Sequence, residues 1–132
     1  QRVRNKLVKS IHEAGGKIMV GSDTPELFLL YGYTVHREMQ NLVEAGLSPY
    51  AALEAATRIP AEFLKSLNTS GTIERGKRAD LVLLNANPLD NIANTERRAG
   101  VMVHGRWLSD ADLQKMLNEA AAKFEKVTNK KE

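Results

Sequence analysis

The chain has 132 residues, 42% of them hydrophobic and 27% charged, which is ordinary for one soluble globular domain. It has no cysteine, which excludes disulfides and thiolate metal sites, and no apolar run of the length that spans a membrane. The net charge of +3 is spread along the chain among acidic residues, and the aromatic residues form no basic stripe for stacking on bases. We therefore expect a cytoplasmic protein without a membrane or nucleic-acid partner.

The first predicted elements are a helix and a strand. Apolar residues recur at helical spacing over residues 3–14, and Gly15-Gly16 ends this helix. Ile18-Met19-Val20 then forms an apolar run without polar alternation, which is typical of a strand that is covered on both faces. Gly21-Ser22-Asp23 leads the chain out of this strand. Residue 1 is Gln, so we expect the start to be a processed end, a trimmed end or an interior point of a longer reading frame.

Asp23 is the best candidate for a catalytic residue. The carboxyl ends of parallel strands are where ligands bind and where chemistry takes place in α/β folds, and Asp23 stands at such an end. The alternative is that Asp23 only caps the loop that follows, as Asp often does before Pro. The residues alone leave both interpretations open.

The remaining elements follow from capping and turn signals. A helix from Thr34 is expected to end at Gly46-Leu47, and Ser48-Pro49 begins the next helix. We expect a boundary near residue 70. After it come a strand over residues 79–84 with a mostly buried core and a connecting loop over residues 85–98. A hairpin around His104-Gly105 follows. Ser109 with Asp112 predicts a capping box that opens an amphipathic last helix.

Three stretches carry a resemblance to a known family. They are Gly21-Ser22-Asp23-Thr24-Pro25, then residues 36–57 with Glu44-Ala45-Gly46-Leu47-Ser48-Pro49, and then residues 71–84 with Gly71-Thr72-Ile73-Glu74. Together they resemble the metal-dependent amidohydrolases, in particular the imidazolonepropionase-like and prolidase-like branch. The likeness covers roughly residues 1–110 and corresponds to the C-terminal third of such an enzyme.

The resemblance implies an α/β fold that is a C-terminal fragment of a (β/α)8 barrel. Residues 17–22 would be the last barrel strand, with the last barrel helix after it. Residues 1–70 would form this barrel-derived helix-strand-helix segment. Residues 71–132 would form a C-terminal β subdomain, part of a composite β-sandwich, with a terminal helix.

The resemblance also implies an activity, the hydrolysis of C–N bonds in small amides, cyclic amides or dipeptides. In the family the acid that matches Asp23 binds the catalytic metal, here expected to be zinc, and acts as general base on the metal-bound water. The family's His-x-His pair, its bridging lysine or acid and two further histidines have no match in this chain. We therefore expect a divalent metal in the complete enzyme and none bound to this chain alone. The alternative is a catalytically silent fragment or scaffold that self-associates or completes a partner.

Four further residues are candidates for contacts with a small-molecule substrate. Phe28, Tyr31 and Tyr33 would line the pocket, because aromatic loops after barrel strands do so in this architecture, or they would only cover the end of the barrel core. His36 would face the pocket mouth, or it would pack or cap the start of its helix.

The pattern of strands predicts a homo-oligomer. A single barrel strand and a few sandwich strands leave unpaired edges and apolar faces, and small open sheets are marginal in water. The faces concerned are Ile18-Met19-Val20, Leu81-Val82-Leu83-Leu84 and the stripe from Leu113 to Phe124. A second copy of the chain is the nearest source of cover for them.

Overall fold

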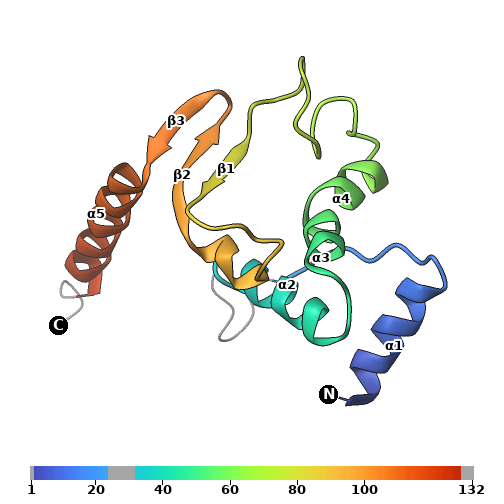
Figure 1. Ribbon diagram of the computed structural model, residues 1–132. Coiled ribbons are helices and arrows are strands. Elements are labelled where there is room, and N and C mark those ends of the chain that lie inside the picture. The colour runs from blue at the N-terminus through green and yellow to red at the C-terminus, as the bar shows by residue number, and fades with distance from the viewer. Residues whose placement is uncertain (1, 24–31, 129–132) are drawn as a thin grey trace.

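A computed structural model of the chain describes residues 2–23 and 32–128, with side chains up to residue 123 (Figure 1). It shows the predicted mixture of helices with a small sheet. In chain order the elements are α1 (Arg2–Glu13), α2 (Thr34–Glu44), α3 (Pro49–Ala56), α4 (Arg58–Phe63), β1 (Leu81–Leu84), the 3-10 helix η1 (Ile92–Glu96), β2 (Arg98–Val103), β3 (Arg106–Ser109) and α5 (Asp110–Thr128).

The junction between α2 and α3 has the predicted capping geometry. Gly46 takes a φ of 106°, and its N–H donates to the carbonyl of Val43 at 2.9 Å, while the N–H of Leu47 reaches the carbonyl of Leu42 at 3.1 Å. These two bonds are a Schellman ending. The hydroxyl of Ser48 then accepts from the N–H of Ala51 at 3.1 Å and caps α3. The turn between the two helices is therefore fixed by local chemistry.

The core lies where α2, α3 and η1 meet. Its buried side chains are Met39, Leu42, Leu47, Ala52, Ala55 and Ile92. The alanines of α3 have no bulk beyond Cβ, which lets α3 approach α2 closely. Ile92 belongs to a stretch that we predicted to be a plain loop, and this prediction is wrong for residues 92–96. The side chain of Asn91 accepts from the N–H of Ala93 at 3.0 Å and starts η1, which turns Ile92 into the core.

The sheet is antiparallel with the strand order β1-β2-β3. The β2–β3 hairpin is confirmed: Val103 pairs with Arg106, and both His104 (φ 48°) and Gly105 (φ 79°) lie in the left-handed region of the turn. Gly100 of β2 is required by packing, since a Cβ there would stand 2.5 Å from Cζ2 of Trp107.

The prediction that β1 is mostly buried is wrong for this chain. Val82 is 60% exposed and Leu83 is 54% exposed. The apolar sequence of β1 is that of a covered strand, but the described residues supply no layer that covers it.

The expected strand over residues 17–22 does not form within the described part of the chain. These residues run without strand pairing between α1 and the residues before α2, and the N–H of Val20 donates to the carbonyl of Ala55 at 2.9 Å. A strand exists only beside another strand, and no strand among the described residues lies next to this segment. Ile18 and Val20 instead pack against the edge of the core.

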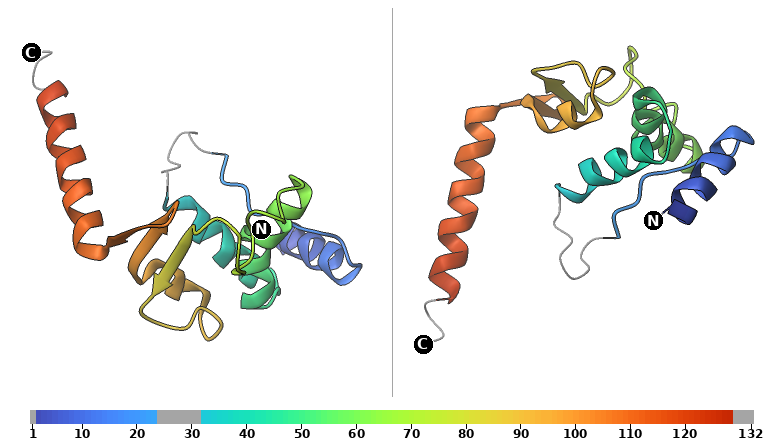
Figure 2. Two further views of the ribbon diagram at one scale, coloured as in Figure 1. Left: turned by 90° about the horizontal axis from the view of Figure 1, so that it is seen from above. Right: turned by 60° about the horizontal axis from the view of Figure 1, so that its bottom comes forward.

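Helices α1 and α5 lie at opposite ends of the molecule (Figure 1). The capping box of α5 is confirmed, since the Asp112 carboxylate accepts from the N–H of Ser109 at 3.0 Å and from its hydroxyl at 2.6 Å. Beyond this start, α5 projects away from the other elements in both views of Figure 2, and Met116 and Leu117 on it are exposed. No helix in the described ranges is both long and apolar enough to cross a membrane.

Candidate active site

Asp23 ends the extended segment that follows α1. Its φ is 50°, in the left-handed region that Asp tolerates better than most residues, and its side chain is exposed. No hydrogen bond or ion pair joins its carboxylate to another described residue. The carboxylate is therefore open to a ligand or to groups from outside the described chain.

An ion-pair network fastens the segment that carries Asp23. Lys17 pairs with Glu62 of α4, and Glu62 in turn pairs with Arg58 at 3.4 Å. Arg58 also pairs with Glu54 of α3 at 2.6 Å. The hydrogen bond from Lys17 holds the pKa of the Glu62 carboxyl below its ordinary value. Lys17 is exposed and the other three groups are partly exposed, so solvent screens these ion pairs and the network positions the segment more than it stabilises the fold.

His36 lies in the first turns of α2 and faces η1. Its Nδ1 is 3.0 Å from the hydroxyl oxygen of Thr95, and the side chain is half-buried. Burial is the main influence on its pKa and lowers it; the Glu96 carboxylate raises it and the Arg98 guanidinium lowers it to smaller extents. The packing role that we weighed for His36 is therefore present, and it leaves the other ring nitrogen available.

A second polar contact joins the same two elements. Gln40 lies one turn after His36, and its side-chain amide donates to Glu96 at 2.8 Å. Thr95 itself is buried, and sequence patterns missed it. The one signal that could have located it is Asn91 followed by Ile92, a cap and an apolar residue inside an otherwise polar stretch.

The predicted substrate contacts are only partly placed. Tyr33 precedes α2 and is 67% exposed. Phe28 and Tyr31 lie outside the described residues. The backbone N–H of His36 donates to the carbonyl of Tyr33 at 3.1 Å, but no hydrogen bond joins the side chains of Asp23, Tyr33 and His36 in the described part of the chain. The chain brings His36 and Thr95 together but does not by itself assemble the predicted pocket.

The residues present do not make a metal site on their own. The described residues contain no group of three or more His, Asp or Glu side chains that could hold an ion. A catalytic zinc needs about three protein ligands in addition to water. Asp23 is a suitable oxygen ligand, but any remaining ligands would have to come from outside the described residues.

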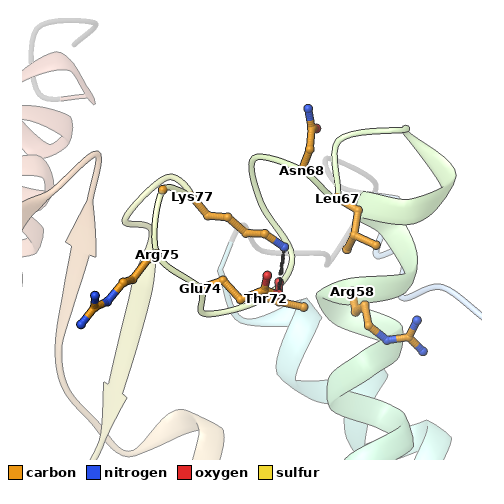
Figure 3. A pocket seen from close by; sticks show the side chains of 8 residues that line it. Arg58, Leu67, Asn68, Thr72, Glu74, Arg75 and Lys77 are labelled. Carbon is orange, nitrogen blue, oxygen red and sulfur yellow. Dashed lines mark hydrogen bonds and ion pairs between the residues drawn. The ribbon is translucent and has the colours of Figure 1, made fainter.

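An open pocket of about 670 Å³ lies elsewhere, between α4 and the turn at residues 72–77 (Figure 3). Lys77 extends across it to Thr72 and pairs with Glu74 at 3.1 Å. The hydrogen bonds from Thr72 and Lys77 lower the pKa of Glu74. The ammonium group of Lys77 is therefore already paired with a carboxylate of the protein. None of the predicted site residues lines this pocket.

Comparison with known proteins identifies the family. The model of the amidohydrolase family matches residues 1–108, so the chain belongs to the amidohydrolase family. Members of this family are generally metal-dependent. No curated protein matches the chain.

Several solved structures share this fold. A candidate prolidase from Bifidobacterium longum is 40% identical, with a TM-score of 0.71 over 86% of this chain and 30% of its own. A Xaa-Pro dipeptidase with bound methionine in the active site is 28% identical, with a TM-score of 0.72 over 80% of this chain and 25% of its own. Phenylurea hydrolase B is 27% identical, with a TM-score of 0.70 over 79% of this chain and 26% of its own. The chain thus spans between a quarter and three tenths of the length of these structures.

Proposed function

We propose that this chain is the part of a metal-dependent hydrolase that carries one active-site acid, Asp23, and that the complete enzyme cleaves C–N bonds in small amides, cyclic amides or dipeptides. The observation that supports it most is the position of Asp23, an open carboxylate at the end of a fastened segment in a chain of the amidohydrolase family. Relatives named as a Xaa-Pro dipeptidase and a phenylurea hydrolase support the choice of bond.

In this proposal residues 17–22 are the last strand of a (β/α)8 barrel, and residues 71–132 form a β subdomain with its terminal helix. Residues 17–22 have no strand beside them among the described residues, and the side chains of β1 are exposed, so both lack neighbours that a larger fold would supply; this supports the arrangement. Zinc is the metal that we expect there, with Asp23 as one ligand. Tyr33 and His36 would contact the substrate, together with Phe28 and Tyr31.

The chemistry assigned to Asp23 is proton transfer. Hydrolysis of an amide needs a base that takes a proton from the attacking water and an acid that gives one to the departing nitrogen. A single carboxylate can do both in turn, because it is protonated after the first step. The exposed side chain of Asp23 has no described partner that would compete for this proton.

The complete enzyme provides the test. We expect it to hydrolyse dipeptides or N-acyl amino acids, to lose this activity after dialysis against a chelator and to regain it when zinc is added. Unchanged turnover in the chelated protein would contradict the metal dependence. Absence of any amide hydrolysis by the metal-loaded protein would contradict the assigned bond.

The 132-residue chain alone provides a second test. Its three histidines, His12, His36 and His104, are scattered, so we expect no stoichiometric zinc after dialysis and no hydrolysis of the same substrates. Elemental analysis of the dialysed protein measures this. One tightly held zinc per chain would show that the chain builds a metal site by itself.

A second role is favoured by the exposed apolar faces. Val3, Leu7 and Ile11 form one exposed stripe on α1, and Val82 and Leu83 are exposed on β1. Such faces fit a chain that self-associates or completes a partner. The two roles are compatible, since a part of an enzyme can be inactive alone and still assemble.

A further inference from the structure

The hydroxyl group of Thr95 determines which nitrogen of His36 carries a proton. Thr95 is 6% exposed, and its Oγ1 lies 2.8 Å from the carbonyl oxygen of Ile92 and 3.0 Å from Nδ1 of His36. A carbonyl oxygen can only accept, so the hydroxyl donates its single proton to Ile92. Its oxygen must then accept from His36, which places a proton on Nδ1.

The second nitrogen, Nε2, is left with a free lone pair. Burial lowers the pKa of His36, which favours the neutral ring at neutral pH. A neutral imidazole has one proton, and here it is on Nδ1. Free histidine in water favours the opposite tautomer, with the proton on Nε2, so the arrangement depends on Thr95.

Nε2 is unbonded and is not cut off from solvent. It has no hydrogen-bond partner in the described part of the chain. Every described polar side-chain atom that is completely covered has a partner, so the unbonded Nε2 is at least partly exposed. The charged groups that act on the ring are Glu96 of η1 and Arg98 of β2, which oppose each other.

We propose that Thr95 is a positioning residue that holds His36 in the Nδ1–H form, so that Nε2 accepts a hydrogen bond from an N–H group of the substrate. The ligand class is therefore an amide or amine that presents a donor to the start of α2. This part of the proposal rests on the proposed function, whereas the tautomer of His36 does not.

The tautomer can be measured on the chain itself. Nitrogen-15 NMR of histidine-labelled protein distinguishes a protonated from an unprotonated ring nitrogen, and only three histidines contribute signals. The signals of His36 are those that vanish in His36→Gln. We expect Nδ1 protonated and Nε2 unprotonated at neutral pH, with a titration below the ordinary value near 6.5. A wild-type His36 with its proton on Nε2 would overturn the proposal.

Two variants of Thr95 isolate the hydroxyl. Thr95→Val keeps the shape but removes the acceptor, and we expect His36 to shift toward the Nε2–H form. Thr95→Ser keeps the hydroxyl and should retain the wild-type tautomer. An unchanged tautomer in a Thr95→Val protein whose amide spectrum remains native would contradict the role of Thr95. If that variant fails to fold, the wild-type tautomer alone decides.

The complete enzyme tests the substrate contact. Thr95→Val should raise KM roughly threefold to tenfold, the effect of one hydrogen bond, with a smaller change in kcat. An unchanged KM alongside an altered tautomer would overturn the contact with substrate. If the complete enzyme hydrolyses no amide at all, the proposed function fails, while the NMR result on His36 is unaffected.

Discussion

His36 and Asp23 differ in how completely the chain surrounds them. His36 is half-buried and bonded through Nδ1 to Thr95, whose own hydroxyl bond ends on the carbonyl of Ile92. Asp23 is exposed and has no bonded partner among the described residues. The chain therefore holds one ring nitrogen of His36 in place, whereas it supplies no partner for the carboxylate of Asp23 among the described residues. A residue of the second kind depends on structure that other parts of a protein provide.

The same contrast holds for the apolar side chains. The meeting point of α2, α3 and η1 buries a cluster around Leu42, Ala52 and Ile92. Helix α1 buries none of its residues, and β1 leaves two of its four side chains more than half exposed. The region of α2, α3 and η1 is packed like a domain interior. Helix α1 and strand β1 have apolar side chains like those of an interior, but these side chains are exposed to solvent.

The largest expected effect is a loss of activity when the open carboxylate of Asp23 is replaced. In the complete enzyme, Asp23→Asn should lower kcat about 10²-fold to 10⁴-fold, since an amide cannot take a proton from water. The matched control is Asp110→Asn, an exposed acid at the start of α5 that lies outside the site. Steady-state kinetics of the two proteins measure the difference. Near-normal turnover of Asp23→Asn would remove Asp23 from the mechanism.

The next effect compares the two apolar regions with one substitution. Leu42 is 9% exposed in the core of α2, and Leu7 is 61% exposed on α1. We expect Leu42→Ala to lower the free energy of unfolding by about 2–4 kcal/mol, because it leaves a cavity. Leu7→Ala should change it by less than about 0.5 kcal/mol. Equal losses in urea melts of the two variants would show that α1 packs as firmly as α2.

The smallest effect concerns the cap of α3. Ser48→Ala removes the hydroxyl that accepts from the N–H of Ala51, and this should cost about 1 kcal/mol of unfolding free energy. Ser10→Ala, a change inside α1 on an exposed residue, is the control and should not destabilise the protein. A cap variant as stable as the control would mean that the α2–α3 junction is held by packing alone.

Sequence patterns located the features that depend on near neighbours. The Schellman ending at Gly46, the cap at Ser48 and the turn at His104-Gly105 are each settled within a few residues, and the structure has all three. The family resemblance was also visible in short motifs and is confirmed over residues 1–108.

The predictions that were wrong, and the residue that was missed, concern features that depend on distant parts of the chain. The run Ile18-Met19-Val20 and the run Leu81–Leu84 both have the sequence of covered strands, but cover is supplied by other elements. The first run finds no strand to pair with among the described residues, and the second keeps exposed side chains. Thr95 was missed because its role requires a contact with His36, 59 positions away, that no local pattern encodes.

The assembly state tests the central claim, that this chain leaves apolar faces which need a partner. Size-exclusion chromatography with light scattering at micromolar concentration gives the mass directly. We expect a mass above the 14.6 kDa of one chain, through contacts that cover the stripe on α1 and the face of β1. A clean monomer of 14.6 kDa that melts cooperatively would show that the chain closes its own core and would contradict the account.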